Sequence, residues 1–205
     1  TYSLPGVYGV TVTTTDDDNG VVSESGFVVI DGPPTADAAG PYTGTEGTPT
    51  GLVGTATDPE NDPLTTAWTF VPVASDIGTT CTYSATTTLA PDVTCDDDAV
   101  LSATLTTSDG INPPVASDTT VTISNAAPIL GAASATAAPI ATGAPVGVAV
   151  PFTDSATHDT HTATVEWGDT TSSAATISEI TGTGSATATH SYAQPGIYLV
   201  VITVY

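Results

Sequence analysis

Residues 2–13, YSLPGVYGVTVT, and residues 192–204, YAQPGIYLVVITV, carry the same pattern near the two ends of the chain. The identical positions are Tyr2, Pro5, Gly6, Tyr8, Val10 and Thr13 and, 190 residues later (192 − 2), Tyr192, Pro195, Gly196, Tyr198, Val200 and Thr203. A match at one fixed spacing indicates an internal repeat. After the Pro-Gly turn the first copy alternates apolar with polar or small residues, and the second is rich in β-branched and aromatic residues, so each copy is expected to be a β-strand.

The first copy continues into a predicted β-hairpin. The alternation in GVYGVTVTTT (6–15) places Tyr8, Val10 and Val12 on one face of a strand. The turn sequence DDDNG (16–20) and a second β-branched run, VVSESGFVVI (21–30), follow it. No stretch of the sequence shows sustained helical periodicity, and its Thr and Val content favours strands. The sequence therefore predicts an all-β protein.

Two proline-containing linkers, DGPP (31–34) and NAAP (125–128), each follow a run of β-branched residues. Proline cannot join a central β-ladder, so each linker marks a boundary between units. The predicted units are 1–32, 33–125 and 126–205, and the two longer ones approach the roughly 100 residues of a two-sheet sandwich. The first unit corresponds to the closing F–G hairpin of a seven-strand sandwich, and the last ends on an F strand without its G strand. We therefore predict tandem immunoglobulin-like β-sandwiches, with the terminal ones incomplete within this chain.

The charge balance excludes several classes of partner. The chain has no Lys or Arg and 22 Asp and Glu, which gives a formal net charge of −22. Such a surface repels nucleic-acid phosphates and anionic membranes. There is also no run of roughly 18 apolar residues that could span a bilayer. We expect neither a nucleic-acid partner nor direct membrane insertion. The first residues lack the features of a signal peptide, so we interpret the chain as mature or as part of something longer.

The two cysteines, Cys81 and Cys95, predict a disulfide within the middle unit. A bond closing a loop of this size contributes roughly 3 kcal/mol in the chain-entropy model. It also indicates an oxidising compartment, and hence an extracellular or cell-surface protein. The alternative is a pair of free buried thiols. We interpret the surrounding segment, residues 75–98, as an insertion between the sheets.

The last unit resembles the polycystic-kidney-disease (PKD) domain family, an immunoglobulin-like β-sandwich of bacterial and archaeal surface proteins. The resemblance rests on VEWGDTTS (165–172) and THSYAQPGIYLVVITV (189–204). The matching residues are Trp167, Gly168, Asp169, His190, Tyr192, Pro195, Gly196 and Tyr198. The middle unit has Trp68-Thr69-Phe70 in place of Trp-Gly-Asp and is similar to PKD-like or cadherin-like repeats. From the residues themselves, Trp68 and Trp167 are expected in the core, and Gly168 and Gly196 in turns that need an unusual φ.

Clustered acids make calcium the expected cofactor. The B–C and F–G loops and the entering linker of a sandwich lie at one end, and hard cations prefer carboxylate and carbonyl oxygens. The candidate ligands in the middle unit are Asp31, Asp58, Glu60, Asn61, Asp62 and Asp109. Asp154 and Asp159 form a second candidate set in the last unit, beside which the DDDNG acids of a completing hairpin would lie. The alternative is that these acids are solvated loop charges. His158 and His161 could ligate zinc, but a polar loop is the favoured interpretation of that segment.

The sequence favours a non-catalytic function. It offers no basic residue to stabilise an anion, no phosphate-binding glycine loop and no nucleophile elbow. The repeat predicts a structural or adhesive surface protein that forms a stalk, filament or array. Its partners would be neighbouring copies, joined by covalent continuation of the repeat past Tyr205 or by donation of the first hairpin. The alternative is an accessory module of a large secreted hydrolase that binds polysaccharide or protein, which an exposed row of aromatic residues would indicate.

Overall fold

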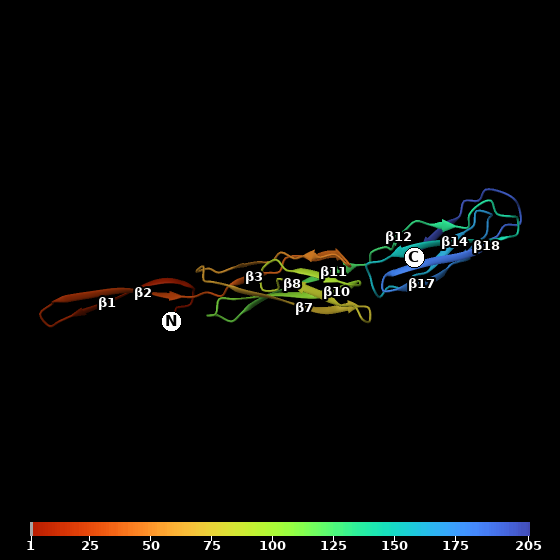
Figure 1. Cartoon of the computed structure of the whole chain (residues 1–205). Helices are drawn as coiled ribbons and strands as arrows, with labels where there is room; N and C mark the ends of the chain where they lie inside the picture. The colour runs from red at the N-terminus through yellow and green to blue at the C-terminus, as the bar shows by residue number, and fades with distance from the viewer. Residues whose placement is uncertain (1) are drawn as a thin grey trace.

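The computed structural model describes residues 2–205, and these form β-strands and connecting loops (Figure 1). An N-terminal hairpin, a middle group of sheets and a last group of sheets follow one another along an elongated molecule (Figure 1). The tip of the hairpin points away from the rest of the chain, and the C-terminus lies at the end of the last group that faces the middle group (Figure 1). No helix among the described residues could cross a membrane.

The N-terminal hairpin consists of β1 (Gly6–Thr15) and β2 (Val21–Ile30). They pair antiparallel in unbroken register from Gly6 opposite Ile30 to Thr15 opposite Val21. The side chain of Asp16 closes the turn by accepting hydrogen bonds from the amides of Asp18 and Gly20. Among the described strands the hairpin pairs with no third one, and Phe27 is 80% exposed. The hairpin therefore has no core of its own, and an isolated two-stranded sheet is marginally stable.

The middle unit is a complete two-sheet sandwich. One sheet has the order β4 (Tyr42–Thr45), β11 (Val115–Ser124), β10 (Ala99–Ser108), β7 (Thr65–Ser75), with β4 parallel to β11 and the other pairs antiparallel. The opposite layer contains β3 (Thr35–Asp37) with β6 (Thr55–Thr57), and β5 (Thr50–Gly51), β9 (Asp92–Cys95) and β8 (Cys81–Ser84). Every second residue of β10 is fully buried, as expected for a strand with one face on a core. Trp68 lies within this core.

The disulfide joins Cys81 on β8 to Cys95 on β9, which lie directly opposite each other. The surrounding segment differs from the expectation that residues 75–98 are an insertion. It supplies two strands of the second sheet, and Val93 and Cys95 are fully buried in the core. Each strand has only four residues and polar residues separate the two, so the sequence shows too little alternation to predict them.

The last unit is a sandwich that is open along one side. Its larger sheet contains β12 (Ile129–Leu130) and β13 (Ser134–Ala135), both paired with β14 (Pro145–Thr153), followed by β18 (Thr183–Ser191) and β17 (Thr176–Ile180). The smaller sheet has the order β16 (Ser172–Ala174), β15 (Ala163–Glu166), β19 (Val201–Val204). The core of the unit consists of two clusters, one of Val148, Val165 and Trp167 and the other of Val150, Ala163 and Ala186. The chain is thus a tandem arrangement of immunoglobulin-like β-sandwiches.

The expected F strand of the last unit is shorter than its sequence pattern suggests. The pattern predicts a strand from Gly196 onward, but the strand begins at Val201. In the structure β19 pairs with β15 alone, so within the described residues its other edge is unpaired. The equivalent strand of the middle unit, β10, has β7 on one side and β11 on the other. Because β15 ends at Glu166, opposite Val201, and no described strand lies on the other edge, the first half of the predicted strand has no ladder to join.

Candidate functional site

An apolar groove lies along the open side of the last unit. It has a volume of about 650 Å³ and runs between the segment 138–144 and the segment 192–200. Its apolar lining residues include Ile140, Val146, Val148, Tyr192, Tyr198 and Val200. In the middle unit the place between the corresponding elements is filled by β11, which pairs with β4 on one side and β10 on the other. The groove therefore has the position of a sandwich's last strand.

The two copies of the repeated sequence share their local geometry. The hydroxyl of Tyr8 donates to the carbonyl of Leu4 at 2.9 Å, and that of Tyr198 donates to the carbonyl of Gln194 at 2.9 Å. In each copy this tyrosine also packs against the tyrosine six residues before it. The ring centroids are 4.2 Å apart for Tyr2–Tyr8 and 4.0 Å apart for Tyr192–Tyr198. The repeat is thus structural as well as sequential. The two copies differ in their partners: β1 is paired along its whole length, and its counterpart is not.

The Trp-Gly-Asp turn of the last unit is tied to the neighbouring sheet. The carboxylate of Asp169 accepts hydrogen bonds from the hydroxyl and amide of Thr171, and lies 2.8 Å from the Nε2 atom of His190. The Thr171 hydroxyl, followed by His190, lowers the pKa of Asp169 to about 2, against a smaller opposing effect of burial. The hydroxyl of Tyr192 donates to the carbonyl of Trp167 at 2.8 Å. These contacts give the motif residues a structural role in holding the turn.

The two motif glycines differ in conformation. Gly168 has a φ of +78°, and a Cβ there would lie 2.5 Å from the carbonyl oxygen of Leu199, so the turn requires glycine. Gly196 does not have a positive φ, so the expectation of an unusual φ is wrong at this position. A Cβ on Gly196 would instead lie 3.1 Å from the ring of Tyr198, and glycine leaves room for that ring.

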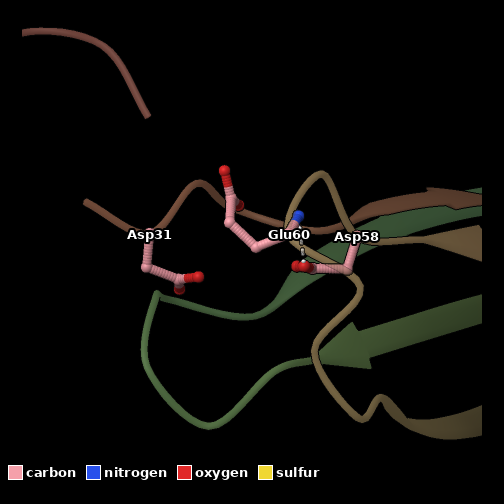
Figure 2. A group of neighbouring side chains, drawn as sticks. All are labelled: Asp31, Asp58 and Glu60. Atoms are coloured by element: carbon pink, nitrogen blue, oxygen red, sulfur yellow. Dashed lines mark hydrogen bonds between the residues drawn. The ribbon is translucent and has the colours of Figure 1, made fainter. Parts of the chain in front are cut away.

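Three acids meet where the hairpin joins the middle unit (Figure 2). Asp31 lies in the linker after β2, and Asp58 and Glu60 lie in the loop between β6 and β7. One carboxylate oxygen of each lies within 4.8 Å of the others. Asp58 Oδ1 accepts the amide of Glu60 at 2.9 Å, and Glu60 Oε2 accepts the amide of Gly32 at 3.0 Å. Asp58 Oδ2 and Asp31 Oδ1 are buried without a hydrogen-bond partner.

The remaining predicted ligands of this junction lie around those three acids. Burial, followed by the neighbouring carboxyl of Asp62, raises the pKa of Asp31 to about 6. The carboxylate of Asp109 accepts hydrogen bonds within its own loop. The amides of Ile111 and Asn112 donate to its Oδ1 and lower its pKa. The side chain of Asn112 donates to Asp109 Oδ2 at 3.1 Å and to Asp31 Oδ2 at 2.6 Å. Sequence reasoning missed Asn112, although an amide three residues after a loop acid is a signal that could have been used.

A second acidic group lies where the middle and last units meet. Asp154 and Asp159, both predicted from the sequence, come from the loop after β14. The structure brings them together with Glu46, which follows β4 in the middle unit. One carboxylate oxygen of each lies within 4.8 Å of the others. Sequence reasoning missed Glu46 because it reaches the group from the preceding unit, and no local pattern predicts that packing.

No protein-family model and no curated protein matches this sequence. Solved structures with some likeness include a chain in the crystal structure of Dpr2 Ig1–Ig2 in complex with DIP-Theta Ig1–Ig3, at 11% identity and a TM-score of 0.35, covering 98% of this chain and 71% of that one. The Escherichia coli adhesin FdeC is 12% identical with a TM-score of 0.31, and the match covers 95% of this chain and 78% of that one. The surface layer protein SbsC, domains 4–9, is 18% identical with a TM-score of 0.29, and the match covers 97% of this chain and 33% of that one. Likenesses of this size do not decide function, and the fold assignment rests on the strand pairing described above.

Proposed function

We propose that this chain is a non-catalytic, extracellular repeat of a structural or adhesive surface array. PKD-like sandwiches would stand end to end in it, as a stalk or filament, with neighbouring copies completing one another's sheets. The observation that carries the proposal is the repeat itself. Its first copy, β1, has the partner strand β2 but no sandwich, and its second copy, around β19, lies in a sandwich but is paired only with β15, so its other edge is open.

The two incomplete surfaces are complementary. The register of β1 and β2 sets Tyr8 opposite Val28. Moved by the repeat offset, the same register sets a β2-type strand beside residues 196–205, with its Val28 opposite Tyr198 and over the apolar groove. Open sheet edges and exposed apolar surfaces recruit strands, because pairing satisfies the backbone and burial removes apolar area from water. The disulfide supports an oxidising location outside the cell.

The β2-type strand comes from a neighbouring copy, by continuation of the repeat within one polypeptide or by donation between chains. Donation requires the donor's β1 to separate from its β2, because β1 and the acceptor's strand β19 compete for the same edge. Electrophoresis of the native material after boiling in SDS distinguishes the two routes. A covalent array stays large, whereas a strand-donated polymer falls to the mass of a single subunit.

The test is a peptide of residues 16–31, DDDNGVVSESGFVVID, added to the purified 205-residue chain. We expect amide hydrogen exchange to slow across residues 196–204, because these amides gain a ladder partner. A peptide carrying Val28→Asp, whose side chain faces the groove, should give no protection. A matched peptide carrying Ser25→Asp, on the opposite face, should protect like the parent. Unchanged exchange at saturating parent peptide would contradict the proposal.

A polysaccharide-binding module of a secreted hydrolase is less well supported. Carbohydrate platforms need several exposed aromatic rings on one face. The exposed aromatic side chains of the described residues are Tyr2, Phe27, Tyr83 and Tyr205. They are divided among the hairpin, β8 and the residue after β19.

A further inference from the structure

Two of the acids at the junction of the middle and last units are almost completely withdrawn from solvent. Glu46 is 1% exposed, and the side chain of Asp154 is also 1% exposed. Asp159 is half-buried and lines a cavity of about 270 Å³ together with Asp154 and Tyr205. Carboxylates are rarely buried to this degree unless a partner or a metal ion compensates their charge.

The hydrogen bonds at this junction leave one buried oxygen unused. Glu46 Oε1 accepts the amide of Ala126, in the linker to the last unit, at 2.7 Å. Glu46 Oε2 is buried and has no hydrogen-bond partner. Asp154 Oδ1 accepts the amide of Ala156 at 2.9 Å, and Asp154 Oδ2 lies 3.2 Å from His161 Nε2. A buried acceptor without a partner costs about 1–3 kcal/mol, and more when it is charged. A cation bound to this oxygen would remove that cost.

The protein supplies little positive charge at this place. The chain has no Lys or Arg. His161 contacts Asp154 of this group through its Nε2 atom. It also contacts Glu179, whose carboxylate lies 2.7 Å from its Nδ1 atom, so its positive charge is shared between two acids. Burial raises the pKa of Glu46, and repulsion from Asp159, Asp154 and the fully buried Asp97 raises it further, against the hydrogen bond from Ala126. One shared histidine offsets only part of the charge of three carboxylates, so the carboxylates repel one another.

We propose that Glu46, Asp154 and Asp159 bind one calcium ion that ties the middle unit to the last unit. The donors are oxygens from three carboxylates, which is the chemistry of a hard divalent cation. Two oxygens on the same Ca²⁺, each at about 2.4 Å, are separated by at most about 4.8 Å, and the three oxygens lie within 4.8 Å of one another. Mg²⁺ requires shorter bonds and near-octahedral geometry, so it fits less well.

The ion would act between the units. Glu46 belongs to the middle unit, and Asp154 and Asp159 belong to the last. A second contact already crosses the same junction, where the amide of Thr157 donates to the carbonyl of Asp96 at 3.2 Å. Binding would therefore fix the angle between consecutive units. This inference does not depend on strand completion, because every donor is present within the chain.

The experiment uses the 205-residue chain in a Glu60→Gln background, which removes a donor from the first junction. Calcium binding is measured by titration calorimetry, and melting is measured in chelator and in calcium at fixed ionic strength. Glu46→Gln should weaken calcium binding by at least about tenfold. In chelator, the Glu46→Gln variant should melt at a higher temperature than the parent, because the substitution removes a buried negative charge. In saturating calcium, the variant should melt at a lower temperature than the parent. If Glu46 had a purely structural role, the order of the two melting temperatures would be the same in chelator and in calcium.

Glu166→Gln, an exposed acid on β15, is the matched control and should bind calcium like the parent. Asp159→Asn tests the same site with a half-buried ligand, should Glu46→Gln fail to fold. Calcium affinity equal to that of the control in both site variants would overturn the proposal. Equal stabilisation of the parent by Mg²⁺ and Ca²⁺ would also overturn it, since that result reports charge screening alone.

Discussion

The F strands of the middle and last units have the same place in their sandwiches but different neighbours. β10 runs over ten residues between β7 and β11, and its inward side chains Leu101, Ala103 and Leu105 are fully buried. β19 runs over four residues beside β15, and in the segment before it Leu199 is 79% exposed. The copy of that segment at the N-terminus forms a ten-residue strand when β2 accompanies it. The presence of a partner, more than β-propensity, decides where these strands begin.

The largest effect on stability should come from disrupting β11, the strand of the middle unit that has no counterpart in the last unit. Val121 is fully buried on β11, opposite Leu101 on β10. Val121→Asp places an unpaired charge in the core and should lower the free energy of unfolding of the middle unit by more than about 4 kcal/mol. Hydrogen exchange measured separately over each unit would detect this. The middle unit should lose protection, and protection of β14 and β18 in the last unit should persist.

Thr120→Asp is the matched control, because Thr120 is exposed on the same strand. It should change the free energy of unfolding by less than about 0.5 kcal/mol. Retained protection of β10 in Val121→Asp would show that an F strand keeps its order without an intact neighbour, and the comparison of the two units would then fail.

Removing the disulfide should destabilise the middle unit relative to the last unit, by less than Val121→Asp does. The bond joins β8 and β9 across a sequence separation of 14 and lies wholly within the middle unit. Cys81→Ser together with Cys95→Ser should destabilise that unit by about 3 kcal/mol, since the unfolded chain gains loop entropy. The last unit should melt unchanged. Equal losses in both units would mean that they unfold as one cooperative body, which calorimetry of the parent would show as a single transition.

Acid should act on the last unit through Asp169, with the smallest effect of the three. Its pKa is lowered to about 2 in the folded protein, chiefly by the Thr171 hydroxyl and then by His190, from an ordinary value of 3.8. A lowered pKa contributes stability above the ordinary value, and this contribution is lost as the pH falls from about 4 towards 2. The melting temperatures of the parent and Asp169→Asn should therefore differ above pH 4 and converge below it. A difference that does not depend on pH would assign the effect to packing.

The sequence was sufficient to predict features that depend on local pattern. The alternation of Tyr8, Val10 and Val12 predicts a strand, and the turn after Thr15 predicts its hairpin, because both are encoded by neighbouring residues. Cys81 and Cys95 predict a bond because a chain with two cysteines allows only one internal pairing. β8 and β9 were missed, since four-residue strands that end in cysteine and serine carry little alternation.

The candidate ion sites depend on packing between units, which local pattern does not encode. Asp58 was predicted because the B–C and F–G loops and the entering linker of a sandwich lie at one end, and Asp154 and Asp159 were predicted because a completing hairpin would bring the DDDNG acids beside them. Glu46 was not, because its position follows from how one sandwich stands on the next. Asp109 was predicted as a ligand, but its loop amides already use its carboxylate. Competing hydrogen bonds of this kind become visible only in three dimensions.

The parallel pairing of β4 with β11 has a mechanical consequence. The chain enters the middle unit through β3 and then β4, and it leaves directly after β11. The strands β4 and β11 pair side by side from Tyr42 opposite Val121 to Thr45 opposite Ser124. Tension along a row of such units would pull these two strands in opposite directions. Their hydrogen bonds lie across the direction of pull, so they would bear the load together and not open one after another. A sandwich acquires this resistance to tension only when its last strand is in place, so completing the last unit would strengthen the row mechanically as well as thermodynamically.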